Sequence, residues 1–486
     1  MVNKLILMHK ILRVIAASAL LLLQQYGHAQ TNQSIKDTLP LEHGAHRIGN
    51  RTDADMTRWR SQRLGQFIHW GLYAIPGGEW KGKTYNGAAE WIRSWKEMPQ
   101  QEYDNLYKQF NPVNYRPEEW AQQASDMGAK YMIITTKHHD GFCLWPSKYS
   151  KYTVAASPWK KDIIGPMVDA YNKKGIDVYL YFSIIDWNQP DWRAALKTPA
   201  DAAAYQRFKV FVKNQLTELL QRYPTVKGFW FDGTWDDSWK NDGAFSDELE
   251  QYLQRLHPGL IIGSRLRADE KGARHFDSNS RLMGDYEQGW ERKLPEKSAD
   301  VHGNDWEGVM TIPENQWGYN AKWTGHIKSS NELIEMLVKS ASLGGNFVIN
   351  FGPKSDGTFR TEEVQRMQEI GHWMKINSSA IDGGTDAGFA KQDWGYYIRK
   401  SGTDSVYMVV CNVPVSGNLR VKLPAQTTLA NVTSLEKNII SGTPELIGKN
   451  EYFIHLDHKS QDAPFVILLQ TSKENRDNSS FEKAKT

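Results

Sequence analysis

The sequence predicts a (β/α)8 barrel followed by a smaller antiparallel β-sandwich. Between about residues 60 and 380, apolar strand-like runs alternate with amphipathic helix-like stretches, and the strand candidates number eight. Several of these runs are apolar throughout, as expected for a parallel sheet that is covered on both faces. After Gly383 and Gly384 the chain changes to short strand-like runs separated by turn residues, which is typical of a sandwich.

The predicted elements of the barrel follow one another in a regular order. Strands are expected at 65–71, 130–139, 176–187, 226–233, 260–265, 281–287, 308–313 and 346–353. Helices are expected at 117–129, 162–175, 205–223, 246–259, 330–345 and 361–377. Pro117 near the start and Gly128 near the end of the first helix are typical boundary residues.

The sandwich candidates are shorter, and an open sheet is the alternative to the barrel. Sandwich strands are expected at 394–402, 405–414, 418–425, 451–457 and 463–471. An open doubly wound sheet needs a glycine-rich phosphate-binding turn after its first strand, and HWGLYAIPGGEW at 69–80 is not one. We therefore expect a catalytic barrel domain at 30–380, a sandwich at 385–472 and a polar tail at 473–486.

The N-terminus predicts an exported protein. Lys4, Lys10 and Arg13 precede a short apolar run at 14–23, and Ala29 ends a small-residue cleavage site, so 1–29 is expected to be a signal peptide. We expect a periplasmic or secreted location and no membrane span in the mature chain. The formal charge of +3, without a basic stripe, predicts no nucleic-acid partner. The oligomeric state is left open by the sequence.

Polar and ionisable residues gather where the predicted barrel strands end. In chain order these are His69; His138, His139 and Asp140; Tyr181 and Asp186; Trp230 and Asp232; Arg265; and Asp285, Glu287 and Glu291. Active sites of such barrels lie at this end of the strands. His138 and His139 would point to opposite sides of a continuing strand, so both can face the site only if the backbone bends there.

Asp232 is the sharpest single signal, and two chemistries fit the set. An aspartate that ends the buried run GFWFD would be a costly buried carboxylate unless it is used or paired. A metal hydrolase would use it with His69, His138 and His139 as ligands. A retaining glycosidase would use a pair of carboxylates, with the histidines binding sugar hydroxyls. The tryptophans near the strand ends favour a sugar; they are Trp70, Trp80, Trp145, Trp187, Trp230 and Trp317.

Five motifs then resemble one family. FIHWGLYAIPGGEW, TTKHHDGFCLWPSKYSKYTV, GFWFDG, GDYE and SLGGNFVINFGPKSDG occur in this order between about residues 60 and 360. Together they are similar to the α-L-fucosidase family, glycoside hydrolase family 29, whose layout also includes a downstream β-sandwich. The resemblance implies a retaining exo-hydrolase that removes terminal α-L-fucose from a fucosylated glycan or oligosaccharide. It implies neither a cofactor nor a metal ion.

The resemblance also assigns roles to individual residues. The nucleophile of the family falls on Asp232, and the acid/base aligns best with Glu291, with Glu287 and Glu307 as the competitors. We expect Asp232 to be surrounded by hydrogen-bond donors, and the acid to sit in a less polar place or near a negative charge. The residues implied to bind fucose are His69, Glu79, Trp80, His138, His139, Tyr181, Trp230, Arg265 and Trp317.

Two other functions stay open at this point. A glycosidase for another fucose-like α-L-sugar, such as an α-L-galactoside, would differ only in the pocket near C6 of the sugar. A catalytically inactive fucose-binding protein would have the same fold, but it would not require both carboxylates.

Overall fold

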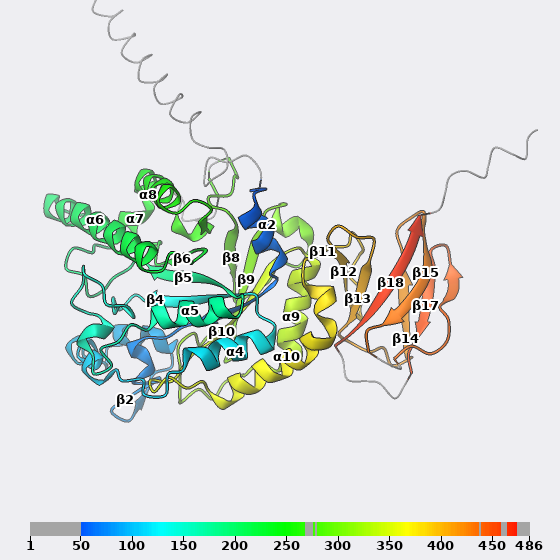
Figure 1. Cartoon of the computed structure of the whole chain (residues 1–486), viewed down its shortest axis with the longest axis horizontal. Coiled ribbons are helices and arrows are strands. Elements are labelled where there is room, and N and C mark those ends of the chain that lie inside the picture. Colours follow the sequence, from blue (N-terminus) through cyan, green and yellow to red (C-terminus); the bar gives the residue numbers. More distant parts are fainter. Residues whose placement is uncertain (1–49, 268–275, 278, 437–438, 458–463, 474–486) are drawn as a thin grey trace, which may run out of the picture.

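The computed structural model describes residues 50–267, 276–277, 279–436, 439–457 and 464–473 (Figure 1). The predicted signal peptide, residues 1–29, lies outside the described residues, as does the predicted polar tail beyond residue 473. Among the described residues, no helix has both the length and the apolar character to cross a membrane.

An eight-stranded parallel sheet forms the larger part of the molecule. Its strands are β1 (Leu64–Ile68), β4 (Tyr131–Lys137), β5 (Asp177–Ser183), β6 (Gly228–Asp232), β7 (Ile261–Ile262), β8 (Glu287–Glu291), β9 (Trp306–Thr311) and β10 (Asn346–Phe351). The order β7-β6-β5-β4-β1-β10-β9-β8 is chain order taken around a circle, with β1 beside β10. The predicted (β/α)8-type barrel is therefore confirmed.

The circle is completed by the backbone between β7 and β8, which pair as strands only with their other neighbours. The N–H of Asp285 donates to the carbonyl of Ile262 at 2.8 Å, and that of Ser264 donates to the carbonyl of Tyr286 at 3.0 Å. The predicted strand 281–287 is therefore wrong in its position. Gly284, at φ 145°, lies so close to this seam that a Cβ there would be 2.6 Å from the Ser264 nitrogen.

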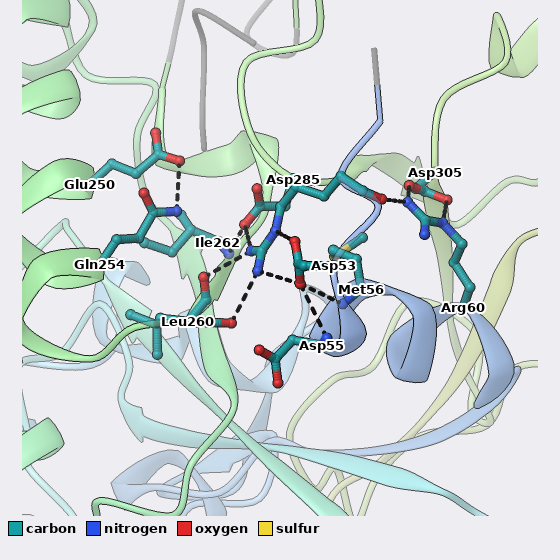
Figure 2. Close-up of polar contacts among 12 residues, drawn as sticks. Asp53, Asp55, Met56, Arg60, Glu250, Gln254, Leu260, Ile262, Asp285 and Asp305 are labelled. Carbon is teal, nitrogen blue, oxygen red and sulfur yellow. Dashed lines mark hydrogen bonds and ion pairs between the residues drawn. The ribbon is translucent and has the colours of Figure 1, made fainter. Parts of the chain in front are cut away.

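A buried arginine fastens the N-terminal segment to the same seam. Arg51 donates to Asp285 Oδ2 at 2.9 Å and to the carbonyl of Leu260 at 3.1 Å, and it also pairs with Asp53. Asp285 Oδ2 accepts from the N–H of Ile262 at 2.9 Å as well. Figure 2 shows Asp53, Leu260, Ile262 and Asp285 converging on this point from three parts of the chain.

Helices cover the outside of the barrel (Figure 1). They are α2 (Ala54–Ser61), α3 (Gln100–Asp104), α4 (Pro117–Met127), α5 (Ile164–Lys173), α6 (Pro199–Arg222), α7 (Asp237–Lys240), α8 (Gly243–Leu256), α9 (Ser330–Ser342) and α10 (Thr361–Ile381). Capping boxes at Thr198 and Ser329 set the starts of α6 and α9, and Gly128 at φ 93° ends α4. Short 3-10 turns occur at η2 (Leu72–Ala74), η3 (Ala89–Ser94), η4 (Leu106–Gln109), η5 (Val154–Ala156), η6 (Ser264–Leu266) and η7 (Ser298–Val301).

The C-terminal part consists of two antiparallel sheets, as the sandwich prediction requires. One sheet has the order β11-β12-β13-β18-β15 and the other β14-β17-β16. The strands are β11 (Gly384–Asp386), β12 (Gly395–Lys400), β13 (Val406–Val410), β14 (Asn418–Lys422), β15 (Thr427–Ser434), β16 (Glu445–Gly448), β17 (Glu451–His455) and β18 (Phe465–Lys473). Residues from both sheets, including Met408, Val421 and Ile454, form one buried cluster. Polar β15 and β16 were not predicted, because neither presents an apolar run.

Candidate active site

A cavity of about 360 Å³ opens at the C-terminal ends of the barrel strands. It is lined by His69, Glu90, Trp91, His138, His139, Trp230, Asp232, Trp235, Arg265, Gln288, Gly289, Glu291, Arg292 and Trp317. These residues follow or end β1, β4, β6, β7, β8 and β9, so most of the strands contribute to one site.

Both histidines of the KHHD segment reach this cavity because the backbone bends. The pairing of β4 with β5 shifts between Thr135 and Lys137, and β4 ends at Lys137. His138 and His139 then turn the same way, with ring centroids 4.2 Å apart. Lys137 points away and donates to Asp186 at 2.9 Å, forming a buried ion pair.

Two of the cavity histidines, His69 and His139, are neutral and have defined tautomers. The Asn350 amide donates to the carbonyl of Trp317, so its Oδ1 accepts from His69 Nδ1 at 2.6 Å. The Ser183 hydroxyl donates to the carbonyl of Ile185 and accepts from His139 Nδ1 at 2.6 Å. Burial lowers the pKa of His69 to about 3 and that of His139 to about 4. Nε2 of each ring is therefore an acceptor for a ligand hydroxyl.

Asp232 is an ionised carboxylate among donors, as the sequence predicts. Its Oδ2 accepts from the Tyr181 hydroxyl at 2.8 Å, and its Oδ1 lies 2.9 Å from Arg265 Nη2. Burial by itself would raise the pKa of Asp232. The charge of Arg265 and the Tyr181 hydrogen bond outweigh it, so the pKa lies below the usual value. This is the state that a nucleophile requires.

Glu291 lies on the other side of the same guanidinium. Arg265 Nη1 donates to Glu291 Oε2, and Arg292 Nη2 lies 3.3 Å from Glu291 Oε1. One arginine thus bridges the two carboxylates that the sequence assigned as nucleophile and acid/base. The surroundings of Glu291 differ from the less polar place expected for the acid, since two cations contact it and the negative charge of Asp232 lies beyond Arg265.

The two competing glutamates lie outside the cavity lining. Glu287 turns back on its own strand, where it accepts from the N–H of Gly289 at 2.6 Å. Glu307 is enclosed below the cavity, where it accepts from Tyr131 and Trp230. Of these three glutamates, Glu291 alone is placed to reach a ligand in the cavity.

Glu79 and Trp80 need a correction, because neither lines the cavity. Glu79 begins β2 (Glu79–Trp80), which pairs only with the exposed β3 (Lys83–Thr84), and its carboxylate contacts Lys322 at 2.8 Å. The cavity is lined instead by Glu90 and Trp91, which repeat the Glu-Trp dipeptide eleven residues later.

Glu90 is held by a specific backbone contact. Its Oε2 accepts from the N–H of Gly318 at 3.0 Å, and burial raises its pKa to about 7. Trp235, Gln288, Gly289 and Arg292 also line the cavity without having been predicted. Gln288 and Gly289 lie within β8 and Arg292 follows it, but the polar sequence of this strand gives no periodic signal.

The aromatic residues divide into two groups. Trp230 stacks on Tyr181 with centroids 5.5 Å apart, and the Arg265 guanidinium lies 4.8 Å above the Trp230 ring. Trp317 packs on His69 at 5.0 Å. Trp70 and Trp145 are fully buried in the packed core and do not line the cavity.

No three His, Cys, Asp or Glu side chains are placed to hold a metal ion within the described part of the chain. A pair of carboxylates in an aromatic cavity at this end of a barrel is the arrangement that a glycoside hydrolase uses.

Comparison with known proteins identifies the family. The sequence profile of the alpha-L-fucosidase family matches residues 44–379. Tissue alpha-L-fucosidase of Rattus norvegicus is 28% identical over 400 residues, which cover 78% of this chain and 81% of that protein. Plasma alpha-L-fucosidase of Homo sapiens is 28% identical over 427 residues, covering 80% and 86%. The chain belongs to the alpha-L-fucosidase family.

Solved structures agree with this assignment. An alpha-L-fucosidase GH29 from Bacteroides thetaiotaomicron is 52% identical, with a TM-score of 0.85 over 90% of this chain and 98% of that chain. Another structure from the same bacterium, with the same identity and TM-score, covers 89% of this chain and all of that chain. It holds a trapped covalent intermediate with 2-fluoro-fucosyl fluoride.

Proposed function

We propose that this retaining α-L-fucosidase removes terminal α-L-fucose from glycans or fucosylated oligosaccharides, with Asp232 as nucleophile and Glu291 as acid/base. The observation that carries the assignment is the bridge formed by Arg265, which contacts both carboxylates within the cavity. Retaining enzymes need two carboxyl groups about 5–5.5 Å apart. The shared contact with Arg265 brings both carboxylates to one cavity, which supports such a pair.

In the first half of the reaction Asp232 attacks the anomeric carbon. The bond from C1 to the glycosidic oxygen breaks, and protonated Glu291 gives its proton to that oxygen. The product is a fucosyl ester on Asp232 together with the free aglycone alcohol. Since Arg265 donates to Glu291 Oε2, this oxygen must leave the contact before it can carry and deliver a proton.

In the second half ionised Glu291 takes a proton from water. The water oxygen attacks C1, the bond to Asp232 breaks, and fucose leaves with the configuration that it had in the substrate. Arg265 and Tyr181 stabilise the carboxylate charge of Asp232 before attack and again after release.

The rest of the cavity suits recognition of a deoxy sugar. His69 and His139 offer ring nitrogens as acceptors, and buried Glu90 offers a carboxyl group to hydroxyls. Trp317 supplies an apolar wall for the C6 methyl group of fucose.

Substituting each glutamate tests the acid/base assignment. Glu291→Ala should be slow on aryl α-L-fucosides with poor leaving groups and much closer to wild type on those with good leaving groups, which need no protonation. Glu287→Ala is the matched control, because this neighbouring glutamate does not line the cavity. Equal loss on all leaving groups in Glu291→Ala, or the leaving-group pattern in Glu287→Ala, would reject the assignment.

We also propose export of the chain through its N-terminal segment. Three basic residues before a short apolar run and a small-residue site support it. N-terminal sequencing of the protein recovered outside the cytoplasm should begin close to residue 30, whereas a mature chain that begins at Met1 would reject export by cleavage.

A further inference from the structure

A carboxyl group is enclosed in the barrel interior just below the cavity. Glu307, the second residue of β9, is 1% exposed. Its Oε2 accepts from the Tyr131 hydroxyl at 2.7 Å, and its Oε1 accepts from Trp230 Nε1 at 3.0 Å. Trp230 lines the cavity and Glu307 does not, so Glu307 reaches the site through the Trp230 indole.

An acidic residue is a costly choice at this position. The interior cluster that contains its partners Tyr131 and Trp230 is apolar and aromatic, with Val309 and Val348 among its members, and burial raises the pKa of Glu307 to about 7. The barrel also makes room for its partner: a Cβ at Gly65 would lie 2.6 Å from the Tyr131 ring. A hydrophobic side chain would fill such a place without the desolvation cost.

Tyr181 and Arg265, which both contact Asp232, pack on the Trp230 indole. Tyr181 stacks against it, with an interplanar angle of 17°, and donates to Asp232 Oδ2. Arg265 lies over its face at 4.8 Å and contacts Asp232 Oδ1. A tilt or shift of the indole would therefore move both partners of the carboxylate together.

We propose that Glu307 is a positioning residue, which fixes the Trp230 indole by accepting from its Nε1 and so holds Tyr181 and Arg265 in place on Asp232. The inference rests on the proposed role of Asp232 as nucleophile. Because the contact orders the groups that act in the chemical step, its loss lowers kcat more than it raises KM.

Two substitutions of Glu307 separate positioning from charge. Glu307→Gln keeps an acceptor for Trp230 Nε1 and can donate to the Tyr131 oxygen, so kcat on an aryl α-L-fucoside should stay within about threefold of wild type. Glu307→Leu keeps the bulk and removes the acceptor, and kcat should fall by about tenfold or more with KM little changed. Wild-type kcat in folded Glu307→Leu would overturn the proposal.

Trp230→Phe tests the contact from the other side and does not depend on the folding of Glu307→Leu. It keeps an aromatic ring and deletes the Nε1–H, so kcat should fall here as well. Adding Glu307→Leu to Trp230→Phe should cause little further loss, since both substitutions remove one contact. The proposal would be overturned if the fold-losses of kcat in the two single variants multiplied in the double variant, or if Trp230→Phe kept the wild-type kcat.

Glu218 provides the matched control. It is also a buried glutamate that accepts from an indole, Trp145 Nε1 at 2.9 Å, but neither residue lines the cavity. Glu218→Leu should leave kcat unchanged in the folded enzyme, and a loss equal to that of Glu307→Leu would overturn the positioning role. Wild-type enzyme inactive on α-L-fucosides, or Asp232→Ala as active as wild type, would instead reject the proposed function.

Discussion

Replacing Tyr181 by phenylalanine should weaken the nucleophile in a way that a pH profile can measure. The substitution removes the hydroxyl that donates to Asp232 Oδ2 at 2.8 Å and keeps the ring that stacks on Trp230. A hydrogen bond to a charged group contributes about 1.5–3 kcal/mol. Since about 1.4 kcal/mol corresponds to one pKa unit, the pKa of Asp232 should rise by about one to two units.

The sign follows from the form of Asp232 that reacts. The ionised carboxylate is the nucleophile, so a higher pKa removes activity from the acidic side. The acidic limb of kcat/KM for an aryl α-L-fucoside should therefore move to higher pH in Tyr181→Phe, while the basic limb stays in place. Initial rates across the pH range, for wild type and variant, give both limbs.

Tyr223→Phe is the control for this experiment. Tyr223 also donates to an aspartate, Asp162 Oδ2 at 2.7 Å, but the pair lies outside the cavity. Removal of the Tyr223 hydroxyl should leave the acidic limb of the kcat/KM profile at the same pH as in wild type. A Tyr181→Phe profile that superimposes on that of wild type would show that Tyr181 does not help to keep Asp232 ionised.

Three further outcomes follow from the structure. Arg51→Ala removes the buried ion pair with Asp285 at the barrel seam and should lower the free energy of unfolding, measured by denaturant titration, by about 3–5 kcal/mol. A change below about 1 kcal/mol would show that the seam does not depend on this ion pair. Burial raises the pKa of Glu307 to about 7 in the folded protein, so protonated Glu307 contributes to the stability of the fold below about pH 4.5, and this contribution is lost as the pH rises through 7. Glu307→Gln does not titrate and should reduce the loss of unfolding free energy over this pH range, followed by thermal unfolding, by up to about 3 kcal/mol. A pH dependence equal to that of wild type would contradict this prediction. Trp317→Ala should narrow the preference for α-L-fucosides over α-L-galactosides, measured as a ratio of kcat/KM, and an unchanged ratio would remove Trp317 from recognition of the methyl group.

The sequence predicts the barrel well where periodicity is strong. The runs before His69, His138 and Asp232 are buried strands, and the ends of these strands meet as expected. The strand before Glu291 was placed too early, because residues 285–286 pair across the seam and not in regular strand geometry. Periodicity carries no information about such a closure.

The site shows a similar division between local and long-range information. Asp232 and the paired histidines follow from their positions after buried runs. The sequence assigned Glu79 to the site from its motif, but the fold places Glu79 in a peripheral hairpin, and Glu90, which was not considered, lines the cavity. Contacts between distant segments, such as Arg265 with Glu291 or Trp230 with Glu307, are set by packing alone.

Azide rescue of Asp232→Ala shows whether Asp232 is the nucleophile. The variant should be nearly inactive on an aryl α-L-fucoside, and azide should restore turnover by entering the space of the lost carboxylate. The expected product has inverted configuration and is β-fucosyl azide, because the external nucleophile replaces the first of two displacements. An Asp232→Ala enzyme that keeps wild-type activity without azide would contradict the assignment of the nucleophile.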